Sequence, residues 1–219
     1  MITTLLFDMD GLLVDSEPWW KVAEKEVFSG FGLNLTDDLL RQVMGFRLNE
    51  VVEYWYHYQP WENPNFEATE IAIIDCMESL LNKHAVALPG VLESLEFAKE
   101  KGFKIALASS SSMRLIDVVV NKLNIKDFFQ LCYSANSVEY GKPHPAIFLE
   151  TAKILGSSPQ ECLVIEDSIN GMVAAKAARM TCVVVPEAIN RNNLKYELAD
   201  FKLETLEEFP NLLTIKHLF

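Results

Sequence analysis

The sequence lacks the marks of exported, membrane-spanning and metal-thiolate proteins. Its 219 residues include only four cysteines, which are widely spaced and form no Cys-x-x-Cys pair. Such cysteines predict core thiols rather than a disulfide framework or a zinc site. No secretion signal opens the chain, and no long apolar stretch is free of charges. We therefore expect a cytoplasmic protein that does not enter a membrane.

Positive charge is scarce as well. Nineteen lysines and arginines oppose 31 aspartates and glutamates, which gives a net charge of −12. This balance argues against nucleic acid and anionic membrane surfaces as partners. An anionic substrate therefore requires local cations to offset the carboxylates. The length suits one substantial domain, or one domain with a smaller insert, and we expect a monomer.

From about residue 87 onward, apolar runs alternate with segments in which apolar residues recur at helical spacing. The expected strands cover residues 103–109, 131–135, 162–167 and 181–186, with helices between them. Strands that alternate with helices predict a mostly parallel sheet covered by helices on both faces. The fold class is therefore α/β, with a Rossmann-like core.

The first strand, at residues 3–8, is separated from the others by a long segment that is helical throughout. We expect residues 1–14 and 87–219 to form the α/β core and residues 15–86 to form an inserted all-helical cap. An insertion after the first strand of a parallel sheet lies over the carboxyl end of the sheet. Open α/β folds bind their ligands at that end.

Polar side chains follow four of the expected strands. In chain order they are Asp8 with Asp10, Ser109 with Ser110, Lys142, and Glu166 with Asp167. Because parallel strands all run in the same direction, these side chains are expected to meet on one rim of the sheet.

The residue types on this rim match the chemistry of phosphoryl transfer. Several carboxylates tolerate one another where they bind a hard divalent cation, and oxygen ligands suit Mg²⁺. A carboxylate can attack phosphorus, and a second carboxyl two residues further on can protonate the leaving oxygen and then activate water. Serine hydroxyls and a lysine can bind the phosphoryl oxygens. Mg²⁺ and Lys142 would together offset the negative charge that an anionic substrate meets.

Four segments of the chain resemble signature segments of the haloacid dehalogenase-like hydrolases. They are "DMDGLLVDSEP" (8–18), "ALASS" (106–110), "GKPHP" (141–145) and "VIEDSINGMVAAKAARM" (164–180), in the same order as in that family. The resemblance is to the branch with a helical cap after the first strand, which includes sugar-phosphate phosphatases and β-phosphoglucomutase. It spans nearly the whole chain.

The resemblance implies a role for each rim residue. Asp8 would be the nucleophile, Asp10 the general acid and base, and Ser109, Ser110 and Lys142 the phosphate-binding residues. Mg²⁺ would be bound by the Asp8 side chain, the Asp10 backbone carbonyl and Asp167. Glu166 lies close by, either as a direct ligand or as a residue that positions the ligands.

Two cap residues are further candidates for binding the substrate. Arg47 is either a surface arginine or a contact to the substrate when the cap closes. Of Trp19 and Trp20, at least one is expected in the cap core, and the other, with Trp20 the candidate, would line the pocket. Aromatic faces suit sugar rings.

The predicted function is Mg²⁺-dependent hydrolysis of a small phosphorylated sugar or polyol, of the hexose or hexitol 6-phosphate type, through an aspartyl phosphate. The alternative is a phosphomutase like β-phosphoglucomutase, which usually has a histidine where this chain has Trp20. Dehalogenation is disfavoured because those relatives lack an aspartate at the position of Asp10. A catalytically silent binding protein would have lost Asp8 or Asp10, and this chain keeps both.

Overall fold

The computed structural model describes residues 1–214, which contain a six-stranded, fully parallel sheet. The strands lie in the order β3-β2-β1-β4-β5-β6. Their bounds are β1 (Thr4–Phe7), β2 (Lys104–Ser109), β3 (Leu131–Ser134), β4 (Cys162–Glu166), β5 (Thr181–Val184) and β6 (Phe201–Lys202). The predicted α/β class is confirmed. The two-residue β6 at the edge was not predicted, because it is too short to show a strand pattern.

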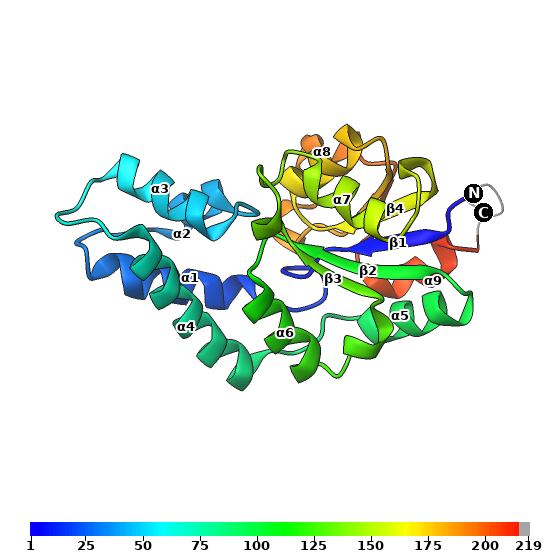
Figure 1. The fold of residues 1–219 in the computed structure, drawn as a ribbon, viewed down its shortest axis with the longest axis horizontal. Helices are drawn as coiled ribbons and strands as arrows, with labels where there is room; N and C mark the ends of the chain where they lie inside the picture. Colours follow the sequence, from blue (N-terminus) through cyan, green and yellow to red (C-terminus); the bar gives the residue numbers. More distant parts are fainter. Residues whose placement is uncertain (215–219) are drawn as a thin grey trace.

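Helices cover both faces of the sheet. In Figure 1, α7 and α8 lie on one face, and α5, α6 and α9 lie on the other. Their bounds are α5 (Val91–Glu100), α6 (Met113–Lys122), α7 (Ala146–Ile154), α8 (Ile169–Ala177) and α9 (Phe209–Leu212). Successive side chains of β1 alternate between two apolar cores, with Leu5 and Phe7 in one and Leu6 in the other.

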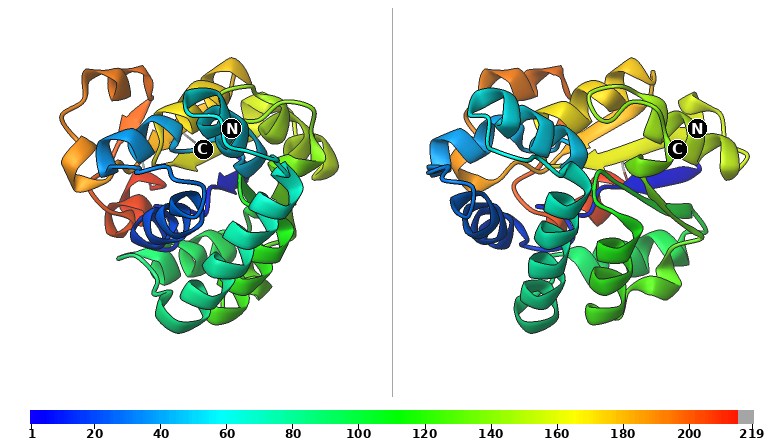
Figure 2. Two further views of the ribbon diagram at one scale, coloured as in Figure 1. Left: turned by 90° about the vertical axis from the view of Figure 1, so that its left-hand side faces the viewer. Right: turned by 60° about the vertical axis from the view of Figure 1, so that its left-hand side comes forward.

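Between β1 and β2 the chain forms a separate group of helices beyond one end of the sheet. They are α1 (Glu17–Ser29), α2 (Asp37–Leu40), a 3₁₀ turn (Arg41–Val43), α3 (Leu48–Tyr58) and α4 (Phe66–His84). Figure 2, viewed from that end, shows these helices in front of the sheet. None of the helices in residues 1–214, the 19-residue α4 included, is long and apolar enough to cross a membrane.

Two connections link the sheet to this group of helices, one before α1 and one after α4, and they lie side by side. Val14 and Ala87 form an antiparallel bridge. Nearby, the rings of Trp19 and His84 stack at a centroid distance of 4.4 Å. Trp19 is therefore occupied at these connections, which leaves Trp20 as the tryptophan of this pair that faces the rim.

The second cap helix is only one turn long. Thr36 caps it, with Oγ1 accepting the backbone N–H of Leu39 at 3.4 Å, and α2 ends at Leu40, where the 3₁₀ turn follows. Gly45 then adopts φ +81°, a left-handed conformation that suits glycine. This turn directs the Gly45 carbonyl at the sheet, where it accepts the Ser110 hydroxyl at 2.9 Å.

The cysteines fit the predicted core thiols. Cys162 and Cys182 are buried, Cys76 and Cys132 are half-buried, and all four are free.

Candidate active site

The strand register places the first rim residues side by side. Phe7, the last residue of β1, is level with Leu107 of β2 and Ile165 of β4. The next residue, Asp8, donates its backbone N–H to the Ile165 carbonyl at 3.0 Å. Asp8 and Glu166 therefore leave the ends of adjacent parallel strands together, as the sequence predicted for the rim.

Lys142 joins these two carboxylates. Its Nζ lies 2.7 Å from Asp8 Oδ1 and 2.6 Å from Glu166 Oε1, and it also donates to the Ala108 carbonyl at 3.2 Å. Burial alone would lower the pKa of Lys142, which is only 3% exposed, but the charges of Asp8 and Glu166 outweigh it and raise this pKa. Lys142 is therefore a fixed ammonium ion at the centre of the rim.

One lysine does not balance the carboxyl groups around it. Asp8, Glu166 and Asp167 are all buried, and each has an oxygen within 4.8 Å of those of the other two. Burial, followed by the charge of Glu166, raises the pKa of Asp8 to about 8. The same two causes, together with the charge of Asp8, raise the pKa of Asp167 well above its ordinary value. A further cation beside Asp8 and Asp167 would lower both pKa values again and favour the ionised carboxylates.

The cluster fits a hard divalent cation. Its donors are all carboxylate oxygens, the ligand type that Mg²⁺ and Ca²⁺ prefer. Gly11 makes room for it, because a Cβ at this position would lie 2.3 Å from Asp167 Oδ2. Its φ of +70° also favours glycine. Asp8 and Asp167 are therefore in place to hold a metal ion, and the Asp10 side chain lies outside this cluster.

Glu166 is occupied on both oxygens. Oε1 binds Lys142, and Oε2 accepts the backbone N–H groups of Asp167 and Ser168, each at 3.1 Å, and the Ser168 hydroxyl at 3.0 Å. A Cβ at Gly171 would lie 1.8 Å from Oε1, so glycine leaves room for this carboxylate. Of the two alternatives left open by the sequence, these contacts favour a residue that positions Lys142 and Asp167.

Asp10 is held by four hydrogen bonds. Oδ1 accepts the Ser16 hydroxyl at 2.6 Å and the Trp20 indole N–H at 3.0 Å. Oδ2 accepts the hydroxyls of Ser111 at 2.7 Å and Ser109 at 3.3 Å. Donors from β2, from the first connection and from the cap thus fix one carboxyl group beside Asp8. Ser16 and Ser111 were not predicted.

The four consecutive serines at residues 109–112 make different contacts. Ser109 is buried and contacts Asp10, Ser110 reaches the cap at Gly45, and Ser112 caps α6 by accepting the Leu115 N–H at 3.4 Å. All four serines of residues 109–112 line the same cavity. Four identical neighbours give no signal of which one faces Asp10, so the sequence alone could not select Ser111.

Arg47 does not line the cavity. Its guanidinium donates to the carbonyls of Val138 at 3.0 Å, Glu139 at 3.3 Å and Ala135 at 3.5 Å, and it pairs with Glu50 at 2.7 Å. The Glu50 carboxylate and the three carbonyl groups thus compensate the positive charge of Arg47, and the hydrogen bonds to the carbonyls connect the cap to the loop after β3. The placement does not support the predicted contact to substrate, and it shows Arg47 joining cap and core instead.

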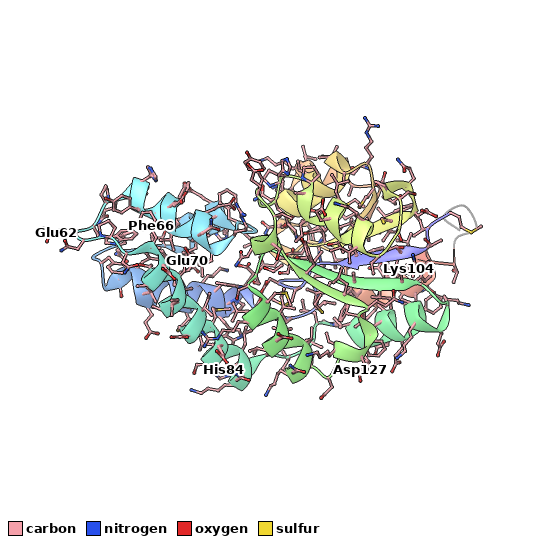
Figure 3. All side chains as sticks on the ribbon, viewed as in Figure 1. Glu62, Phe66, Glu70, His84, Lys104 and Asp127 are labelled. Atoms are coloured by element: carbon pink, nitrogen blue, oxygen red, sulfur yellow. The ribbon has the colours of Figure 1, made fainter. Side chains whose placement is uncertain are left out.

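A cavity lies between the rim and the cap. It offers about 80 Å³ to the centres of water-sized molecules, against the roughly 10–15 Å³ that one water needs. The rim contributes Asp8, Asp10, Lys142 and Asp167, and Trp20 lines it from the cap. The other polar cap residues that line it are Glu17, Lys21, Glu24 and Glu70. Figure 3 labels Glu70 within the cap, away from Glu62 at the far tip.

Comparisons with known proteins agree with this site. Residues 5–185 match the family model described as haloacid dehalogenase-like hydrolase. The chain is 39% identical to hexitol phosphatase B of Escherichia coli K12 over 208 residues, which cover 94% of each chain. It is 30% identical to the phosphorylated carbohydrates phosphatase of Thermotoga maritima, over 95% of this chain and 97% of that protein.

A solved structure of β-phosphoglucomutase from Clostridium difficile is also similar. It superposes with a TM-score of 0.85 at 25% identity, covering 95% of this chain and 93% of the other. The family match includes the strand ends that carry Asp8, Asp10, Lys142, Glu166 and Asp167. With the fold, the rim and the relatives in agreement, the chain belongs to the haloacid dehalogenase-like hydrolases.

Proposed function

We propose that this protein is a Mg²⁺-dependent phosphatase that hydrolyses small sugar or sugar-alcohol phosphates through an aspartyl phosphate at Asp8. The family and the phosphatases that match nearly the whole chain make it a phosphoric monoester hydrolase. The observation that carries the finer proposal is the pair of carboxyl groups that follows β1, those of Asp8 and Asp10. Asp8 is bound to Lys142 and is one of the three carboxylates of the cluster that fits a metal ion, whereas the donors to Asp10 within residues 1–214 are all neutral.

In the proposed reaction we assign a role to each oxygen of Asp8. Lys142 holds Asp8 Oδ1, so Oδ2 is the oxygen assigned to attack phosphorus. The new bond joins Oδ2 to phosphorus, the bond from phosphorus to the ester oxygen breaks, and Asp10 gives its proton to that oxygen. Water then attacks the phosphorus of the aspartyl phosphate while Asp10 takes a proton from it. The bond from phosphorus to Asp8 Oδ2 breaks, inorganic phosphate leaves, and the Asp8 carboxylate is restored. When bound beside Asp8 and Asp167, Mg²⁺ would supply positive charge to the phosphoryl oxygens.

The contact of Trp20 supports an assignment of the Asp10 proton to one of the two carboxyl oxygens. An indole N–H can only donate a hydrogen bond, so Oδ1 must remain an acceptor. We therefore assign the acidic proton to Oδ2, next to Ser109 and Ser111, whose hydroxyls can also accept a hydrogen bond. Trp20, predicted beside the site as a pocket residue, would thus also orient the general acid.

The cavity wall favours water over a second sugar as phosphate acceptor. A phosphomutase must bind a bisphosphate, which needs cations on both sides of the cavity. Among the cap residues that line it within the described part of the chain, Lys21 is the one lysine, against the carboxyl groups of Glu17, Glu24 and Glu70. Arg47, the expected cap cation, is engaged elsewhere. This wall suits a substrate with one phosphate.

An acceptor assay separates the two functions. With Mg²⁺, hexose or hexitol 6-phosphates should release inorganic phosphate. β-Glucose 1-phosphate should yield no more than a trace of glucose 6-phosphate, even with a bisphosphate primer. Both products can be followed in one reaction by coupled assays. Isomer formation that outpaces phosphate release would identify a mutase instead.

Removing the metal should remove both activity and part of the stability. At a Mg²⁺ concentration of about 100 times Kd, binding stabilises the fold by about 2.7 kcal/mol, which corresponds to a rise in Tm of about 5–10 °C. Thermal unfolding with Mg²⁺ and with EDTA measures this difference. Asp167→Asn should shrink it, whereas Asp117→Asn, an exposed aspartate on α6, should not. An equal Mg²⁺ effect in Asp167→Asn and wild type would contradict the metal site.

A further inference from the structure

One face of α1 forms a wall of the cavity. Glu17, Trp20, Lys21 and Glu24 all line it, at the spacing of residues that share a helix face. Trp20 contacts Asp10, and α1 runs from the rim into the cap, as Figure 1 shows. Four residues beyond Trp20, Glu24 lies about 6 Å further along the helix axis. Glu24 is thus placed in the part of the cavity remote from the phosphate site.

The carboxyl group of Glu24 is buried without a full set of partners. The residue is 7% exposed, and its Oε2 has no hydrogen-bond partner within residues 1–214. The Trp55 indole N–H lies beside it but does not complete a hydrogen bond in this geometry. Folded proteins rarely leave a buried carboxyl in this state, because the unmade hydrogen bonds are costly. A ligand in the cavity would supply the missing partner.

The surroundings make Glu24 a selective contact. Most nearby cap residues that line the cavity are apolar, among them Leu40, Leu48, Val51 and Ile74. In such a wall the few polar groups, here Glu24 with Glu17, Lys21 and Glu70, fix how a ligand is oriented. Burial, followed by the charge of Glu17, raises the pKa of Glu24 to about 8. At neutral pH its carboxyl is therefore largely protonated, and it can both donate to a hydroxyl and accept from one without repelling an anion.

We propose that Glu24 binds hydroxyl groups at the end of the substrate remote from the phosphate, and so selects six-carbon over three-carbon phosphates. An extended chain of single bonds advances about 1.2 Å per bond, so the offset of about 6 Å between Trp20 and Glu24 spans about five bonds. A hexitol or open-chain hexose 6-phosphate has hydroxyls at that distance from its ester oxygen, whereas glycerol 3-phosphate does not. This inference rests on the proposed function.

Kinetics on three substrates test the assignment. The substrates are a hexitol 6-phosphate, glycerol 3-phosphate and p-nitrophenyl phosphate, assayed with wild type, Glu24→Leu and Glu24→Gln. Loss of a hydrogen bond to a substrate hydroxyl should lower kcat/KM of Glu24→Leu for the hexitol phosphate by about 10- to 100-fold. The loss should fall mainly on KM, since this contact is made before and during reaction. Glu24→Gln, which keeps polar atoms there, should lose less.

The other two substrates and a matched variant provide controls. Both control substrates should change less than about threefold. Glycerol 3-phosphate is too short to reach Glu24, and p-nitrophenyl phosphate carries no hydroxyl group for Glu24 to bind. Glu26→Gln makes the same substitution at an exposed position of α1 and should change nothing. The Tm of Glu24→Leu should equal or exceed that of wild type, because the substitution removes a buried carboxyl. Equal losses on all three substrates, or none on the hexitol phosphate, would overturn the assignment.

A binding measurement keeps this inference separate from the proposed function. Calorimetry of hexitol 6-phosphate with Mg²⁺ on an Asp8→Asn background needs no turnover. Adding Glu24→Leu should weaken that binding about 10- to 100-fold. If wild type hydrolyses none of the phosphates, the proposed function fails, and the titration still decides the role of Glu24. Unchanged binding would exclude Glu24 as a contact to hydroxyls.

Discussion

Replacing Asp8 with asparagine should lower turnover by about 10⁴- to 10⁶-fold, the range seen when catalytic-triad residues are removed. The amide is a poor nucleophile and a weak metal ligand. It nevertheless preserves the shape of the site, because its oxygen can still accept the Lys142 ammonium in place of Asp8 Oδ1. The loss should be equally large for sugar phosphates and aryl phosphates, since both must be attacked by the same atom.

Stability separates a lost nucleophile from a damaged fold. The pKa of Asp8 is raised from 3.8 to about 8, first by burial. The folded state therefore binds this proton more tightly than the unfolded state, so ionising Asp8 costs stability as the pH rises from about 4 to about 8. Asp8→Asn lacks that cost. In EDTA its Tm should exceed that of wild type at pH 8.5, and the difference should narrow toward pH 5.

Two controls complete this experiment. Asp15→Asn makes the same substitution at an exposed aspartate seven residues further on, and it should leave both turnover and Tm close to wild type. Turnover of Asp8→Asn within tenfold of wild type would eliminate Asp8 as the nucleophile. A large fall in its Tm with Mg²⁺ present would show that the lost activity is structural.

The rim could be predicted from the sequence because it depends on the direction of the strands. Asp8, Ser109 and Glu166 stand at or just beyond the ends of apolar runs, and parallel pairing brings those ends to one edge. Lys142 precedes the loop proline Pro143 and joins the rim by a hydrogen bond to Asp8. Local patterns and one topological rule thus account for most of the site.

The cap side of the site could not be predicted in the same way. Helical spacing identifies the apolar face of a helix but not the direction in which an individual polar side chain points after packing. Arg47 was expected to contact substrate, yet the carbonyls after β3 accept its hydrogen bonds, and their position depends on how cap and core fit together. Glu24 gave no signal, since a glutamate on an amphipathic helix is ordinarily exposed.

The position of Asp10 could be predicted from the local sequence pattern, but its contacts depend on how cap and core pack together. Its two-residue spacing from Asp8 could be read from the sequence, whereas its contacts come from two separate segments, the start of α1 with Ser16 and Trp20 and the loop after β2 with Ser111. These contacts determine which hydrogen bonds an asparagine at position 10 could keep. Its oxygen would accept the Trp20 N–H, and its amide N–H₂ would donate to serine hydroxyls, which also accept hydrogen bonds. The fold of Asp10→Asn should therefore be retained.

Asp10→Asn should lower kcat by about 10²- to 10⁴-fold for a hexitol 6-phosphate, the usual cost of losing a general acid or base. The alkoxide of a sugar alcohol needs the proton from Asp10 as it leaves, whereas p-nitrophenolate leaves without one. The deficit in the first chemical step should therefore be smaller for the aryl phosphate. Asp38→Asn, at an exposed cap aspartate, provides the matched control.

The measurement must isolate that first step. Asp10 is also assigned to activate water, so the variant should hydrolyse its aspartyl phosphate slowly, and steady-state rates would then show one deficit for every substrate. Rapid mixing with p-nitrophenyl phosphate should instead give a burst of nitrophenolate close to one equivalent per enzyme, followed by slow turnover. With the hexitol phosphate, quenched-flow sampling should show little release of hexitol in the same interval. A burst absent from both substrates, or equally fast in both, would count against Asp10 as the proton donor, because only the leaving-group oxygen distinguishes the two reactions.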